Sequence, residues 1–241
     1  MSISKIFNVL DSLRGGLPKL IPETEAIDKF HAKWIPLTDA PFRLAPNIVG
    51  YSLEGLRHPD FVATAEFIRH KLGVYVFPSD WKINSFGWPI SPDGRVLGEA
   101  TWYGDDIISC SVPSYHFKSP AKIHLRGRVL ALLSDFALIN YYHFVLDALG
   151  RFSIYESLRN EIGGIDFVIV PKPFSKRLMR WIDFLQLSEK IVVVDAGQIV
   201  SADQIVVPTF PGVKRDISPL VIDFWRKRVS CEEYVSAKKY T

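Results

Sequence analysis

Four short apolar runs alternate with segments whose apolar residues recur at helical spacing in the second half of the chain. The runs are residues 128–133, 165–170, 191–194 and 204–207. Nearly continuous apolar runs of this length are typical of strands that are buried on both faces of a parallel sheet. Helices are expected between them, over about 140–160 and 174–187, and a last helix begins at Ser218-Pro219. The pattern predicts an α/β fold with a Rossmann-like parallel sheet and helices on both faces.

Upstream of residue 128 the pattern changes to short strands and turns. Residues 74–77 and 95–97 have strand-like composition, and Ser91-Pro92-Asp93-Gly94 between them is a turn sequence. Proline presets φ at the second turn position, and glycine accepts a positive φ, so this stretch is predicted to be antiparallel. A helix is expected over 59–71, with proline-rich loops before it.

These patterns suggest a domain organisation. We predict an N-terminal extension of helices and loops over 1–72, followed by one α/β domain over 73–241. Within that domain, a β-rich entry would cover 73–127 and the Rossmann-like part 128–230.

Composition limits the classes of function. Of 241 residues, 48% are hydrophobic, and 29 basic against 26 acidic residues give a net charge of only +3. That balance argues against a nucleic-acid-binding protein. Two distant cysteines, Cys110 and Cys231, exclude a cysteine zinc site and a disulfide framework and suit a reducing, cytoplasmic location.

Membrane association is limited to the surface in this interpretation. No apolar run approaches the roughly 20 residues that a membrane-spanning helix needs. Apolar residues recur at helical spacing over residues 3–13, which predicts a helix docked on its own domain. Peripheral contact with a membrane is the alternative for that helix.

The helix predicted after residue 140 carries the candidate chemistry. At about 100° per residue, four polar groups share an arc of roughly 80° on one face: Asn140, His143, Asp147 and Arg151. Val145 and Leu149 lie on the opposite face and are expected to be buried. The polar stripe follows the carboxyl end of the 128–133 strand, the edge of an α/β sheet where ligands bind.

The residue types in this stripe suit proton transfer. Histidine titrates near neutrality, and a neighbouring carboxylate such as Asp147 can fix its tautomer and raise its basicity. Arg151 could neutralise Asp147 or hold an anionic group of a substrate, and Asn140 is a natural N-cap. A plain ladder of salt bridges on a surface helix is the alternative interpretation.

Residues 140–152 resemble a segment of the family 61 glycosyltransferases. Their sequence NYYHFVLDALGRF is similar to that family's N-Y-F-H-W-x-x-D-x-L-P-R-L. Downstream, Val168-Ile169-Val170-Pro171, a helix with WIDFLQL, and ADQIVVP at 202–208 follow in the family's order. The likeness spans about residues 92–229, and Gly150 stands where the family has proline.

The resemblance implies an inverting, metal-independent transferase of GT-B type, without a cofactor. Such an enzyme moves a sugar from a nucleotide-sugar donor to a hydroxyl of a glycan or protein acceptor. By position, His143 and Asp147 become the candidates for acceptor activation, with the choice of base left open. Asn140, Tyr142 and Arg151 become candidates for shaping the site and binding substrate.

The donor-binding half is not recognised in this sequence. The family's second α/β half carries a G-A-x-l-x-N type segment, and no such segment occurs here. We therefore expect a fragment or half-enzyme whose second half is missing or supplied elsewhere.

Other classes of enzyme have less support in the sequence. Asp105-Asp106 is adjacent and turn-like rather than an Asp-x-Asp metal motif, and G-x-S-x-G is absent. The alternative from a different class is a non-catalytic carbohydrate-binding or assembly protein that retains the acceptor half. Five aromatic residues could stack on sugars in that case, although packing is favoured: Trp81, Phe86, Trp88, Trp102 and Tyr103.

Overall fold

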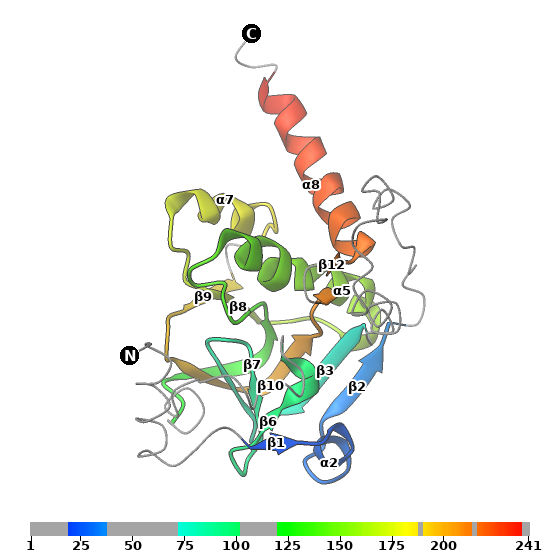
Figure 1. Ribbon diagram of the computed structural model, residues 1–241, viewed down its shortest axis with the longest axis vertical. Helices are drawn as coiled ribbons and strands as arrows, with labels where there is room; N and C mark the ends of the chain where they lie inside the picture. Colours follow the sequence, from blue (N-terminus) through cyan, green and yellow to red (C-terminus); the bar gives the residue numbers. More distant parts are fainter. Residues whose placement is uncertain (1–18, 38–71, 102–119, 188–189, 214–215, 238–241) are drawn as a thin grey trace, which may run out of the picture.

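A ten-stranded mixed sheet is the framework of the protein (Figure 1). The computed structural model describes residues 19–37, 72–101, 120–187, 190–213 and 216–237. Several sequence predictions concern residues outside these ranges: the helices over 3–13 and 59–71, Cys110, Asp105-Asp106, Trp102 and Tyr103. None of the helices within the ranges is long and apolar enough to cross a bilayer.

Four parallel strands form the centre of the sheet, as the apolar runs predict. They are β7 (Ile123–Ala131), β8 (Phe167–Pro171), β9 (Ile191–Val194) and β10 (Ile199–Pro208), in the spatial order β10-β7-β8-β9. Val129 pairs with Phe167, and Val168 pairs with Ile191. Valine, isoleucine and leucine dominate β8 and the carboxyl halves of β7 and β10, where both faces are covered.

β7 and β10 both begin several residues earlier than predicted. The first half of β7 alternates exposed and half-buried residues, and the first half of β10 includes the polar Ser201 and Asp203, so neither shows a continuous apolar signal. The two halves of β10 are separated by an irregularity between Ala202 and Gln204. Opposite it, Gly127 has φ +117, and its N–H donates to Asp203 Oδ2 at 2.7 Å. Only glycine adopts this conformation without strain.

The strands of the β-rich entry are antiparallel, as predicted, and they extend the sheet beyond β10. β3 (Gly73–Pro78) and β4 (Lys82–Asn84) both pair with β10, and β5 (Pro89–Ile90) and β6 (Val96–Leu97) follow. The 91–94 turn joins β5 to β6, with the Gly94 N–H donating to the Ser91 carbonyl at 2.9 Å. Gly94 has φ +84, which explains the glycine.

Part of the predicted N-terminal extension belongs to the sheet. β1 (Leu20–Ile21) pairs with β6, and β2 (Lys33–Pro36) pairs with β3, with α2 (Glu23–Asp28) between them. These strands are too short for a period-two pattern to be recognised. Pro36 ends an edge strand, where a missing N–H is tolerated.

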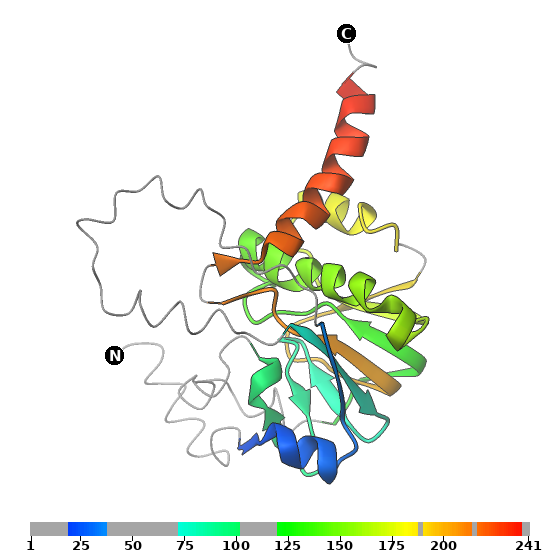
Figure 2. The same ribbon diagram turned by 90° about the vertical axis from the view of Figure 1, so that its right-hand side faces the viewer.

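Helices cover one face of the sheet (Figures 1 and 2). They are η5 (His143–Ala148), η6 (Leu149–Arg151), α5 (Phe152–Ser157), α6 (Arg159–Ile162), α7 (Lys176–Asp183) and α8 (Pro219–Ala237). Their apolar side chains pack on Leu130, Val168, Val170 and Val206. Ser218 Oγ accepts the Leu220 N–H at 3.3 Å, so it caps α8 as predicted. A two-stranded hairpin, β11 (Gly212–Val213) and β12 (Asp216–Ile217), precedes α8.

The prediction of crossover helices on both faces is wrong for the described residues. The second face, with Val129, Ile169 and Val207, packs against Trp81, Ile83 and Leu97 of the β-rich entry and against Ala26 of α2. The connections β7–β8 and β8–β9 run in one direction along the sheet, and right-handed crossovers then place both on one face. The return from β9 to β10 spans only residues 195–198, too few for a helix.

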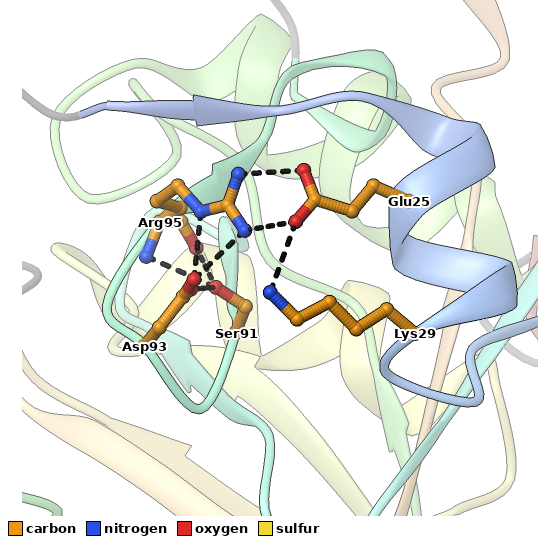
Figure 3. A network of polar contacts seen from close by, with 5 residues as sticks. All are labelled: Glu25, Lys29, Ser91, Asp93 and Arg95. Atoms are coloured by element: carbon orange, nitrogen blue, oxygen red, sulfur yellow. Dashed lines mark hydrogen bonds and ion pairs between the residues drawn. The ribbon is translucent and has the colours of Figure 1, made fainter.

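Ion pairs fasten α2 to the 91–94 turn (Figure 3). The Arg95 guanidinium donates to both carboxylate oxygens of Glu25, at 2.6 and 2.7 Å, and to Asp93 at 2.8 Å. Lys29 also reaches Glu25, at 3.4 Å. The hydrogen bond from Arg95 holds the pKa of Asp93 at about 2, below its ordinary 3.8, and it also lowers the pKa of Glu25.

We predict that this network makes stability depend on acid. A carboxylate whose pKa is lower in the folded chain stabilises it above the unfolded pKa, and loses that contribution as pH falls through the folded value. The window for Asp93 therefore runs from 3.8 down to about 2. Urea unfolding across this window should show a smaller loss of stability in Arg95→Met than in the unmodified chain. Lys29→Met, which removes a longer and exposed contact, is the control. Equal losses in Arg95→Met and the unmodified chain would contradict the prediction.

Candidate active site

The candidate site lies on the segment that follows the carboxyl end of β7. Residues 132–139 leave the strand through a series of turns, and Asn140 then begins the helical segment. Asn140 Oδ1 accepts the backbone N–H of Tyr142 at 2.9 Å, which is the bond expected of an N-cap. Asn140 itself is exposed and Tyr142 is half-buried, so both lie at the rim of the segment.

The predicted continuous α-helix is interrupted by a π-turn. The Leu149 N–H donates to the carbonyl of Phe144, five residues back, across η5. Residues 149–151 then tighten into the 3₁₀ turn η6 before α5 begins. π-turns are rare and occur frequently at functional sites. A turn that holds more residues also changes the direction of every side chain after it.

This change of phase buries residues that the sequence placed on an exposed face. Asp147 is only 6% exposed and Arg151 is 0% exposed. His143 keeps 17% of its side chain accessible. The exposed polar stripe is therefore a wrong prediction for Asp147 and Arg151, although Val145 and Leu149 are buried as expected.

His143 and Asp147 form a close pair. His143 Nδ1 lies 2.5 Å from Asp147 Oδ2. The His143 ring also contacts Phe136 and Tyr142, with centroids 5.1 and 5.4 Å apart. When Nδ1 carries the proton donated to the carboxylate, the lone pair of the neutral imidazole is on Nε2. The pair therefore fixes both the orientation and the tautomer of the histidine.

The pKa of Asp147 is raised above its ordinary value, and burial is the largest cause. Loss of solvation raises the pKa of this carboxyl, while the hydrogen bond from His143 and the charges of His143 and Arg151 lower it. An unaccompanied carboxylate in this position would tend to take up a proton. The hydrogen bond from His143 and the positive charge of Arg151 oppose that shift and favour the ionised form.

Arg151 joins the carboxyl ends of β7 and β10. Its Nε donates to the Pro208 carbonyl at 2.7 Å, and its Nη1 donates to the Leu133 carbonyl at 2.5 Å. The guanidinium also lies 4.0 Å from the centre of the Phe210 ring, a cation–π contact. These contacts favour a positioning role, and binding of substrate by Arg151 remains a prediction.

The guanidinium is charged although it is buried. Burial lowers the pKa of Arg151 to about 9, and the negative charges of Asp135 and Asp147 oppose that shift. Arg151 therefore remains protonated at neutral pH. Nη2 is buried, and the described residues offer it no hydrogen-bond partner.

Sequence reasoning missed Asp135. This residue is 8% exposed, follows the carboxyl end of β7, and accepts the indole N–H of Trp88 at 2.5 Å. Its position directly after an apolar run is the signal that could have identified it. Trp81 and Trp88 are fully buried, so they serve packing, as favoured from the sequence, rather than an exposed sugar platform.

Comparisons with known proteins add no relative: no family model, no curated protein and no solved structure matches the chain. Within the described ranges, no group of three or more His, Cys, Asp or Glu residues is arranged to hold a metal ion.

We predict that Arg151 is essential for the fold. Arg151→Met removes the donors to two carbonyls and leaves Asp135 and Asp147 without a neighbouring cation. Loss of one partner from a buried charged group costs about 3–5 kcal/mol of unfolding free energy. Urea unfolding followed by tryptophan fluorescence measures this loss. Arg159→Met, on an exposed surface of α6, should stay within about 0.5 kcal/mol. If Arg151→Met were as stable as the unmodified chain, the proposed positioning role of Arg151 would be wrong.

Proposed function

We propose that this chain is the acceptor-side half of an inverting, metal-independent glycosyltransferase of GT-B type. It would receive a hydroxyl of a glycan or protein acceptor and join it to a sugar from a nucleotide-sugar donor. The observation that carries the proposal is the His143–Asp147 pair, 2.5 Å apart, after the carboxyl end of a parallel strand. The resemblance of residues 140–152 to the family 61 glycosyltransferases supports the same assignment.

The strand order is compatible with this proposal. The four parallel strands run β9-β8-β7-β10, which is the third, second, first and fourth in chain order. Doubly wound sheets use this order, and their ligands bind where it reverses, beyond the carboxyl ends of the strands. The reversal here lies between β7 and β10, whose ends Arg151 connects.

His143 is the proposed general base. Inversion in one step requires a group that removes the proton from the acceptor hydroxyl as the new bond forms. In this proposal Nε2 of His143 accepts that proton, and Asp147 stabilises the resulting imidazolium through Nδ1. Asp147 is more deeply buried than His143, which favours the histidine as the group that meets the acceptor.

The acceptor would enter over the rim of the segment. Asn140 is exposed and Tyr142 half-buried on the same turn as His143, so both can contact the acceptor. Stabilisation of the departing nucleoside diphosphate would come from the donor-binding half.

The first test concerns His143 in an enzyme that also contains a donor-binding half. Loss of a general base lowers the rate of transfer by about 10²-fold or more, so His143→Ala should show at least that loss. Because His143→Ala also removes the hydrogen-bond partner of the buried Asp147, some loss of stability is expected, and transfer rates are compared at a temperature where both proteins are folded. His124→Ala is a matched control, since His124 is an exposed histidine on β7. Full activity of a folded His143→Ala protein would refute the assignment.

Two further substitutions test which side chains contribute to the stability of the fold. Leu149→Ala should cost roughly 2–5 kcal/mol of stability, because Leu149 is fully buried in the core. Asp147→Asn should also destabilise the fold, because this buried carboxylate is hydrogen-bonded to His143 and lies near the charge of Arg151.

A second prediction concerns the donor. If most nucleotide contacts come from another half, this chain alone should bind nucleotide sugars weakly. Isothermal titration calorimetry with uridine, guanosine and cytidine nucleotide sugars should show no tight complex. A submicromolar dissociation constant for any of them would place the donor site within these residues and refute the half-enzyme proposal.

A further inference from the structure

Exposed apolar side chains gather near α7 and the segment after β7. The large hydrophobic residues with the highest exposure are Ile139 at 77%, Tyr141 at 51%, Phe174 at 48% and Met179 at 43%. The Tyr141 ring meets Trp181 of α7 edge-on, 6.2 Å between centroids, so the two segments are neighbours. Single exposed hydrophobic residues are ordinary, but a group of this kind indicates an interaction site.

The same surface is strongly basic. Residues 172–183 contain four basic residues (Lys172, Lys176, Arg177 and Arg180) and one acidic residue, Asp183, a net charge of +3. This short segment thus carries as much net charge as the whole chain. Lys172 pairs with Asp195 at 2.6 Å, whereas the described residues give Lys176, Arg177 and Arg180 no salt bridge.

The geometry of α7 combines both properties on its outer side. Leu178 and Ile182 are buried against the core, while Lys176, Arg177 and Arg180 are exposed. At about 100° per residue, these three basic positions fall in one arc between Met179 on one side and Trp181 on the other. In Figure 1, α7 lies at the periphery of the molecule, above the helical segment that follows β7.

We propose that this surface, which we term the α7 surface (Ile139, Tyr141, Phe174, Lys176, Met179 and Arg180), docks the protein on an anionic lipid membrane. Basic side chains are attracted to anionic headgroups, and exposed aromatic and aliphatic side chains insert at the boundary of the acyl chains. The net charge of +3 over residues 172–183 favours an anionic membrane over a protein partner, whose binding to the same aromatic, Met and Arg side chains would not require anionic lipid. The N-terminal helix considered from the sequence is not needed for this contact.

The α7 surface lies beside the candidate site, so membrane docking would bear on the proposed function. Tyr141 lies two residues from His143, so the membrane would meet the protein beside the candidate site. A surface-held acceptor could then reach His143 without leaving the membrane. The docking itself does not depend on glycosyl transfer and can be tested separately.

Vesicle sedimentation with the full chain tests the proposal. We expect binding to vesicles of phosphatidylcholine mixed with phosphatidylglycerol, weakening at high salt, and little binding to phosphatidylcholine alone. Each basic residue near an anionic surface strengthens binding several-fold, so Lys176→Glu with Arg180→Glu should lower partitioning on the order of tenfold or more. Phe174→Ser with Met179→Ser should also lower it. Lys33→Glu with Arg159→Glu makes the same charge change at exposed positions elsewhere and should have a smaller effect.

Three results would overturn the proposal. One is the absence of binding to the anionic vesicles. Another is an equal loss in the control pair, which would mean that net charge alone matters. The third is binding to a soluble polyanion such as heparin that matches vesicle binding and is unaffected by Phe174→Ser with Met179→Ser. Unfolding curves of all variants should coincide, because the altered side chains are exposed.

Discussion

The buried guanidinium of Arg151 is the contact on which the candidate site depends. Two buried backbone carbonyls lie at this edge of the sheet, those of Leu133, two residues beyond β7, and of Pro208, the last residue of β10. A buried unpaired carbonyl is costly. Arg151 satisfies both at once. The planar guanidinium has several N–H donors at fixed positions and can donate to both carbonyls, a geometry that a lysine ammonium does not provide. The ends of β7 and β10 are therefore joined at the point where the order of the parallel strands reverses.

The π-turn of η5 is what brings Arg151 to this position. In a regular α-helix, residues 143, 147 and 151 would lie along one exposed stripe. The bond from the Leu149 N–H to Phe144 and the following 3₁₀ turn alter that phase. Asp147 and Arg151 turn inward, while His143 remains partly accessible. A partly accessible histidine and a carboxylate shielded from water are both results of the same local irregularity.

Sequence alone predicts β8, β9 and the carboxyl halves of β7 and β10, because these stretches are nearly continuous apolar runs. The 91–94 turn is predictable for a similar reason, since proline and glycine specify their own backbone angles. β1 and β2 are too short to show a period. The π-turn has no sequence signal of its own, so the burial of Asp147 and Arg151 could not be foreseen. The close approach of His143 and Asp147 is predictable from the sequence, because the i, i+4 spacing brings them together in either kind of turn.

Arg151 also has an electrostatic effect that is separate from its hydrogen bonds. Burial favours the protonated form of Asp147, and a neutral carboxyl cannot stabilise an imidazolium at His143. The positive charge of Arg151 favours the ionised form without a hydrogen bond to Asp147 being required. A lysine at this position would retain the charge and lose the planar guanidinium, whereas a methionine would lose both. The difference between these two substitutions therefore separates the mechanical role of Arg151 from its control of the charge on Asp147.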